Sequence, residues 1–201
     1  MRRAVATWAG LLSSTVLLTG ALAGCTGDEP DDPATTTSGA DTETSASPSP
    51  TAEPSPDVTK PERPAAMDEH DADGAAAAAV YFMELYPYIM KTGDTAEFEK
   101  MSHKSCGYCD EALEQAGQIA ERGDKYIGGD ITANVVKTYR QDAATGILPL
   151  DVEVAEKASS IEDSEGNVLF ESEAATSLDR VEIAWSDDGK WVVLGVPDTQ
   201  E

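Results

Sequence analysis

The apolar residues of this sequence change from a helical to an alternating period after Gly128-Gly129, and this change limits the folds the chain can adopt. Before the glycine pair, apolar side chains recur at intervals of three and four residues, as in amphipathic helices. After it, they occupy every second position, as in half-buried strands. Because strands do not alternate with helices, the sequence predicts an α+β fold with N-terminal helices packed on an antiparallel sheet.

The first predicted helix begins at a cap on Asp71 or Asp73 and runs to about Met90. Its apolar residues fall on one face at helical spacing: Ala78, Phe82, Leu85 or Tyr86, and Ile89. Pro87 lies late in this run and lacks an amide proton, so it should kink the helix or end its regular part.

Two further helices are predicted before the glycine pair. Asp94 or Thr95 caps the second, and Glu97 is the partner of Asp94 in an approximate capping box. The third runs from about residue 107 to residue 122 and ends at Gly123, which can adopt the left-handed closing conformation.

The C-terminal half predicts a curved four-stranded antiparallel sheet. The alternating segments are 131–139, 148–155, 181–185 and 191–194. A turn at 163–167 precedes a further short apolar run, 168–170. Asp187-Asp188-Gly189-Lys190 separates the last two strands and predicts a tight hairpin, because Asp-Gly supplies the positive φ that such turns need.

A segment poor in large hydrophobic side chains precedes the helices. Residues 26–66 contain eight of the eleven prolines, thirteen Ser or Thr and nine acidic residues, and Val58 is their single large aliphatic residue. Such a composition cannot bury enough apolar surface to offset the entropy cost of ordering. We therefore expect a disordered linker over 25–66 and a globular domain over 67–201.

The N-terminus has the order of charge and hydropathy of a secretory signal, with Arg2-Arg3 before an uncharged, mostly apolar stretch. The stretch ends in Leu22-Ala23-Gly24-Cys25, which resembles the lipobox of bacterial lipoproteins. The resemblance implies removal of residues 1–24 as a lipoprotein signal peptide. It also implies acylation of Cys25, by diacylglyceryl and palmitate chains, and a lipid anchor on the extracytoplasmic side of the cell membrane. The alternative is an uncleaved transmembrane helix, which the Ser and Thr residues of the stretch disfavour.

The net charge of −24 disfavours nucleic-acid binding, since phosphate recognition needs clustered Lys and Arg. Within 67–201 the balance is 10 basic minus 29 acidic residues, or −19, and anionic headgroups should repel such a domain. We therefore expect membrane contact through the lipid anchor on Cys25. We expect the domain itself to be a non-catalytic module that binds an envelope protein or a small ligand.

Cys106-Gly107-Tyr108-Cys109 is a compact motif whose two thiols could form a disulfide, take part in redox exchange or bind a metal. Once Cys25 is lipidated, two thiols remain in an oxidising compartment, which favours a structural disulfide between Cys106 and Cys109. A four-residue loop gives such a bond about 2 kcal/mol by the chain-entropy estimate.

Two alternatives for this motif stay open. A redox-active pair would need the thiol pKa lowered at a helix start, but thioredoxin-like sites have a strand before the motif, whereas a helix precedes it here. A metal site would join His103 to the two cysteines, with Asp110 or His70 as further ligands, although structural zinc needs four ligands.

No spacing in the sequence identifies a catalytic site. Neither a Gly-x-Ser-x-Gly elbow nor a His-Glu-x-x-His motif occurs, so we expect no enzyme activity and no cofactor. The alternative is a small enzyme or ligand-converting cone that uses a Tyr and an Asp in its pocket. Its candidate residues are Tyr81, Tyr86, Tyr88, Asp94, Tyr139 and Asp151.

Several motifs together carry a family resemblance: Lys60-Pro61, Gly74, Thr92-Gly93-Asp94-Thr95, Cys106, Cys109 and Gly128-Gly129. With them, most of residues 60–201 resembles a family of actinobacterial lipoproteins known only as a domain of unknown function. The order of elements also resembles the nuclear transport factor two-like cone, in which helices close one side of a curved sheet. These resemblances imply a fold but no catalytic or ligand-binding residues.

Overall fold

The computed structural model describes residues 58–197. The predicted signal peptide, Cys25 and residues 26–57 of the predicted linker lie outside these residues, as do residues 198–201. The described part contains three α-helices, one short 3-10 helix and seven strands. None of its helices combines the length and apolar character needed to cross a bilayer.

The helices lie close to their predicted positions. A 3-10 helix, η1 (Ala65–Asp68), precedes α1 (Ala72–Thr92), α2 (Ala96–Met101) and α3 (Gly107–Arg122). The Asp71 carboxylate caps α1 by accepting a hydrogen bond from the Gly74 amide at 2.8 Å.

One detail of α1 and one of α2 differ from expectation. Of the two outcomes expected at Pro87, a kink or an end to the regular helix, the second does not occur, because α1 continues to Thr92 and closes at Gly93 with a φ of 68°. Thr95 occupies the N-cap of α2, as one of the two predicted alternatives, without a side-chain cap hydrogen bond. Glu97 forms an ion pair with Lys100 at 3.6 Å in place of the expected capping box.

Seven strands form two antiparallel sheets, which confirms the α+β class and the four-stranded sheet. That sheet has the order β2 (Ile131–Thr138), β3 (Leu148–Glu156), β6 (Ala175–Trp185) and β7 (Trp191–Gly195). The hairpin between β6 and β7 forms as predicted. The second sheet, with the order β1 (Lys125–Gly128), β4 (Ser159–Glu162) and β5 (Val168–Ser172), was not predicted, and it takes up the apolar run at 168–170.

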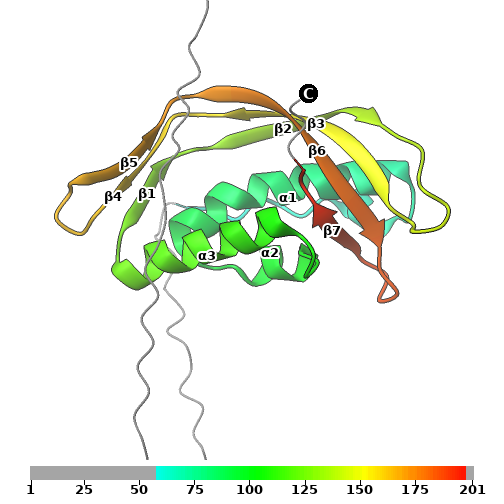
Figure 1. The fold of residues 1–201 in the computed structure, drawn as a ribbon, viewed down its shortest axis with the longest axis horizontal. Helices are drawn as coiled ribbons and strands as arrows, with labels where there is room; N and C mark the ends of the chain where they lie inside the picture. The colour runs from blue at the N-terminus through cyan, green and yellow to red at the C-terminus, as the bar shows by residue number, and fades with distance from the viewer. Residues whose placement is uncertain (1–57, 198–201) are drawn as a thin grey trace, which may run out of the picture. The chain divides into compact units, whose positions relative to one another are not determined.

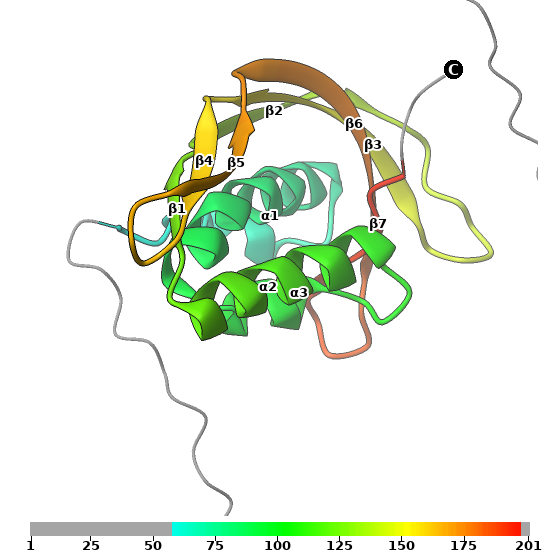
Figure 2. The same cartoon turned by 60° about the vertical axis from the view of Figure 1, so that its left-hand side comes forward.

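A bend separates the two sheets, and all three chain segments that cross it are interrupted at the same place. Three chain segments cross it, and each is interrupted by two residues: 129–130, 157–158 and 173–174. The interruptions are aligned, because Ser159 pairs with both Gly128 and Ser172, while Glu156 pairs with both Ile131 and Ala175. The strands therefore arch together over the helices, with β1, β4 and β5 on one side of the bend (Figures 1 and 2).

Glycine is required at the bend for steric reasons. Gly128 and Gly129 have φ values of 73° and 65°, a region that costs other residues about 1–2 kcal/mol. A Cβ on Gly128 would lie 2.2 Å from the Ala158 carbonyl oxygen, and one on Gly129 would lie 2.2 Å from Tyr126 Oη. The glycine pair thus serves the bend as well as marking the change of period.

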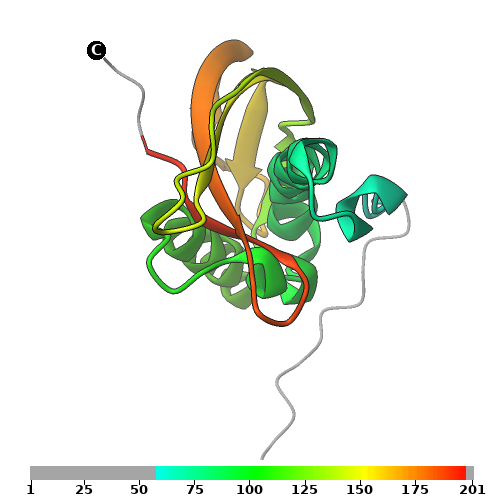
Figure 3. The same ribbon diagram turned by 90° about the vertical axis from the view of Figure 1, so that its right-hand side faces the viewer.

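The core lies between α1 and the concave face of the four-stranded sheet (Figure 3). From the sheet it receives the alternating residues Leu148, Leu150, Val152, Val154, Val181, Ile183 and Val193. From α1 it receives the predicted apolar face, including Phe82, Leu85 and Ile89, all fully buried. Phe82 also stacks on Phe98 of α2 at a ring-centroid distance of 4.3 Å, so one core joins helices and sheet.

Packing begins before the expected domain start at Met67. Val58 packs on the edge of the core, and Lys60 reaches Asp94 with an Nζ–Oδ2 distance of 3.7 Å. The last residues of the predicted linker therefore contact the domain.

Candidate functional site

Cys106 and Cys109 form a disulfide at the start of α3, as predicted. Both residues are fully buried, and Cys106 occupies the N-cap, where its Sγ accepts a hydrogen bond from the Cys109 amide at 3.2 Å. His103 Nδ1 lies 2.7 Å from Ser105 Oγ. In residues 58–197, no group of three or more His, Cys, Asp or Glu side chains is placed to hold a metal ion.

The Thr92–Thr95 motif links α1 to α2, and all four of its residues form structural contacts. Thr95 Oγ1 donates to Glu99 Oε1 at 2.5 Å. Thr92 Oγ1 donates to the Tyr88 carbonyl at 2.7 Å and accepts from the Asp94 amide at 3.1 Å. A Cβ on Gly93 would lie 3.2 Å from the Ala120 Cβ, so this turn passes close to α3. The motif therefore forms a hydrogen-bonded turn that joins α1 to α2 and packs close to α3.

The structure brings together two Tyr–Asp pairs that no sequence spacing revealed. Tyr88 Oη donates to Asp94 Oδ2 at 2.8 Å. Tyr139 Oη donates to Asp151 Oδ2 at 2.7 Å, and Arg180 reaches Asp151 Oδ1 at 2.8 Å. The two pairs belong to different elements: one joins α1 to the α1–α2 turn, and the other joins the residue after β2 to β3 of the four-stranded sheet.

The pKa values of Tyr88, Asp94 and Asp151 are all shifted away from neutral pH. The hydrogen bond from Tyr88 holds the pKa of Asp94 below its usual range, and burial raises the pKa of Tyr88. Burial alone would raise the pKa of Asp151, but Tyr139 and Arg180 together hold it below its ordinary value. General acid–base catalysis works best with a pKa near the working pH, and the pKa values of both aspartates are shifted away from neutrality.

The other two candidates lie in the interior. Tyr81 is buried in the core, whereas Tyr86 is half-buried and donates to Gln115 Oε1 at 3.1 Å. Burial raises the pKa of Tyr86 to about 12. The Tyr108 ring lies 6.2 Å from that of Tyr86.

A third phenol, Tyr126, extends this group towards the sheet, where its Oη donates to Glu156 Oε1 at 3.3 Å. Burial raises its pKa and that of Tyr108, so both phenols stay protonated. Neither tyrosine was a sequence candidate, because they come from α3 and β1 and meet only through the packing of helix on sheet.

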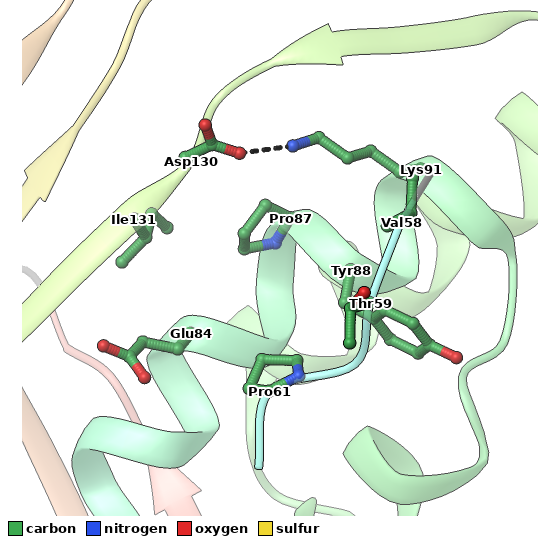
Figure 4. A pocket seen from close by; sticks show the side chains of 9 residues that line it. All are labelled: Val58, Thr59, Pro61, Glu84, Pro87, Tyr88, Lys91, Asp130 and Ile131. Atoms are coloured by element: carbon green, nitrogen blue, oxygen red, sulfur yellow. Dashed lines mark hydrogen bonds and ion pairs between the residues drawn. The ribbon is translucent and has the colours of Figure 1, made fainter. Parts of the chain in front are cut away.

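A groove of about 340 Å³ lies where the described chain begins (Figure 4). Three segments line it: residues 58–61, the C-terminal part of α1 from Glu84 to Lys91, and Asp130 with the first residue of β2. Pro87 and Ile131 give it apolar walls, and Tyr88 contributes its ring. Its volume is within the range of small-molecule sites, about 300–1,000 Å³.

Ion pairs cross one side of the groove. Lys91 Nζ lies 2.6 Å from Asp130 Oδ1, and Lys157 Nζ lies 3.2 Å from Asp130 Oδ2. The hydrogen bonds from both lysines hold the pKa of Asp130 below its usual range. Glu84 adds a second carboxylate to the lining.

The groove can therefore offer a ligand both charges together with apolar contact. The groove could not be predicted from the sequence, because its residues, from Val58 to Ile131, are separated by up to 73 positions and match no motif. Asp130 was visible in the sequence solely as the residue after Gly128-Gly129.

Solved structures give distant similarity. The intermembrane space region of the chloroplast protein ARC6 is 15% identical with a TM-score of 0.49, over 62% of this chain and 93% of that one. Aln2 from a Streptomyces species is 12% identical with a TM-score of 0.37, over 64% of this chain and 91% of that one. A search of curated proteins finds no match.

The sequence match is more informative than these structural ones. Residues 46–197 match the family described as "Family of unknown function (DUF6318)". The match includes all the described strands and helices. The chain belongs to this family of unknown function.

Proposed function

We propose that the protein is a lipoprotein of actinobacterial type, anchored by Cys25 on the extracytoplasmic side of the cell membrane, whose domain binds a partner without catalysis. The observation that carries the anchor is the sequence Leu22-Ala23-Gly24-Cys25 at the end of an uncharged apolar stretch. Two or three acyl chains on one cysteine satisfy the requirement for stable anchoring.

The segment after Cys25 supports a tether. Its prolines and acidic residues favour extended conformations, and 41 residues (26–66) would span roughly 35–40 Å as a coil or about 130 Å as polyproline helix. This is enough to hold a domain away from the membrane surface. The chain then enters the domain along the groove, so a ligand there would lie beside the tether.

The electrostatics support binding rather than catalysis. General acid–base catalysis works best with a carboxyl or phenol whose pKa approaches neutrality, whereas the pKa values of Asp94, Asp130 and Asp151 are all lowered. The alternative of a ligand-converting enzyme has in its favour that Tyr88 lines the groove. The curved sheet over three helices supports the resemblance to the nuclear transport factor two-like cone, a fold that does not itself determine function.

Acylation at Cys25 provides the test. Cells grown with an alkyne analogue of palmitate should label the unsubstituted chain, and Cys25→Ala should lose the label and leave the membrane fraction. Thr26→Ala is the matched control and should keep both properties. An unsubstituted chain that is membrane-bound but unlabelled would instead indicate an uncleaved helix and overturn the proposal.

A further inference from the structure

We propose that the outer edge of β5 is a docking site for an extended segment of another envelope protein, in which apolar residues alternate with Lys or Arg. The inference rests on the proposed role of the domain as a binding module and assigns the surface and the chemistry of the partner. The surface consists of Val168, Leu169 and Phe170 together with the carboxylates of the β4–β5 hairpin. It is separate from the groove beside Val58.

Three consecutive apolar side chains of β5 are exposed. The exposed fractions are 51% for Val168, 54% for Leu169 and 53% for Phe170. Phe170 shares a face with Ile161 and Tyr126, which lie opposite each other in register, and Tyr126 is buried. The apolar surface of the core therefore continues outwards to Phe170, where water replaces a protein neighbour.

The strand that carries these residues is at the edge of its sheet. One side of β5 pairs with β4, and no strand within 58–197 pairs with the other side. Edge strands in soluble proteins are usually protected by Lys, Pro, a β-bulge or a covering element. The opposite edge, β1, is only four residues long, begins with Lys125 and contacts both α1 and α3. β5 has no Lys or Pro, and a single extra residue, Leu169, interrupts its pairing with β4.

The negative charge around β5 favours a partner segment that carries positive charge. Residues 159–173 contain five carboxylates and no basic residue: Glu162, Asp163, Glu165, Glu171 and Glu173. None of the five forms an ion pair with another described residue, although Asp94, Asp130 and Asp151 elsewhere each do. An apolar strip within an unneutralised acidic hairpin is complementary to an apolar, basic segment.

A hollow of about 410 Å³ next to the edge strengthens this assignment. It is lined by β1, β4 and β5, with Ile127 on one side and Glu171 and Glu173 on the other. Ile127 is 44% exposed. A strand added beside β5 would place a long basic side chain within reach of these carboxylates, which matches recognition by strand addition.

A second copy of the chain fits this surface poorly. Edge-to-edge pairing of two β5 strands would bring two acidic hairpins together, and each chain carries a net charge of −24. Like charges close to one another across paired strands are destabilising. A basic segment from another protein meets no such repulsion.

Photo-crosslinking in intact cells tests the docking site. The photoreactive residue p-benzoylphenylalanine replaces Phe170 in the full chain, and separate chains carry it at Val136 or at Glu84. Val136 is the matched control, since it is apolar and 51% exposed on β2. Glu84 reports on the groove. The adducts are digested and the crosslinked partner segment is sequenced.

We expect an adduct from position 170 whose partner segment alternates apolar residues with Lys or Arg. Glu171→Lys should reduce its yield about tenfold, the effect of 1.4 kcal/mol, and Glu153→Lys on exposed β3 surface should not. An adduct to a second copy, or equal yields at 136 and 170, would overturn the docking site. Adducts from position 84 alone would overturn the docking site on β5 but would still support the proposal that the domain is a binding module. The absence of adducts at all three positions would contradict both the docking site and the binding module.

Discussion

Asp151 lies on the outer face of the four-stranded sheet, yet only 7% of its surface is exposed. The Arg180 guanidinium covers it, with two nitrogens within 3.0 Å of Oδ1, and Tyr139 donates to Oδ2. Arg180 lies 4.6 Å from the centre of the Tyr139 ring, so the three side chains form one closed cluster. The cluster stabilises the pairing of β3 with β6, in which Asp151 lies opposite Arg180.

Replacing Asp151 should therefore lower stability in a pH-dependent way. Its folded pKa lies below the unfolded value of about 3.9, so its stabilising effect is complete above that value and is lost as the pH falls through the folded pKa. Asp151→Asn should lower the free energy of unfolding at pH 7 by about 1–3 kcal/mol. It should also flatten the decline in stability below about pH 4.

Urea unfolding between pH 3 and pH 7 measures both effects. Glu153→Gln is the control on the same strand, since Glu153 is exposed and has no ion pair with another described residue. It should change the free energy of unfolding by less than about 0.5 kcal/mol. Equal losses for the two variants would show that the Asp151 cluster contributes nothing specific.

At the scale of elements, the bend between the two sheets determines where the exposed edge of β5 lies. β1, β4 and β5 continue into β2, β3 and β6 across the aligned interruptions. β7 pairs with β6 from Glu182 to Trp185, far from the bend. The three-stranded sheet is thus an extension of the fold beyond the main core, and its position depends on the backbone at Gly128.

Gly128→Ala should distort this bend. The added Cβ would meet the Ala158 carbonyl oxygen at 2.2 Å in addition to the cost of a positive φ. Gly146→Ala is the matched control, because Gly146 has a φ of 72° and no atom within 4 Å of an added Cβ. We expect a loss of about 1–2 kcal/mol for Gly146→Ala, and about 1–3 kcal/mol more for Gly128→Ala.

Thermal and chemical unfolding of the two variants give the comparison. Hydrogen exchange gives a local readout, since the amides of β1 and β4 should lose protection in Gly128→Ala alone. If both variants lose the same stability, the contact with Ala158 has no energetic role and the bend does not depend on Gly128.

For the molecule as a whole, the sequence predicted those features that depend on residues close together in the chain. The Asp71 cap, the limits of α3 and the β6–β7 hairpin follow from nearby residues and were confirmed. The three-stranded sheet was missed because β1 and β4 are four residues long, too short for an alternating pattern to be distinguished. The groove and the Tyr–Asp pairs were missed because distant segments meet there through tertiary packing.

The start of the domain is the remaining difference at this scale, and it allows a direct test. The linker was expected to end at residue 66, but Val58 packs on the core and Arg63 lies 2.9 Å from Asp68. In the full chain, deleting 26–66 should lower the free energy of unfolding by about 1–2 kcal/mol relative to deleting 26–57, through lost apolar burial and exposed ion pairs. Denaturant unfolding in mild detergent compares the two deletions with the intact chain.

The shorter deletion should match the intact chain, because it retains every contact within residues 58–197. Equal stability of the two deletions would place the domain start at Met67 after all, and would mean that residues 58–66 lie on the groove without stabilising it.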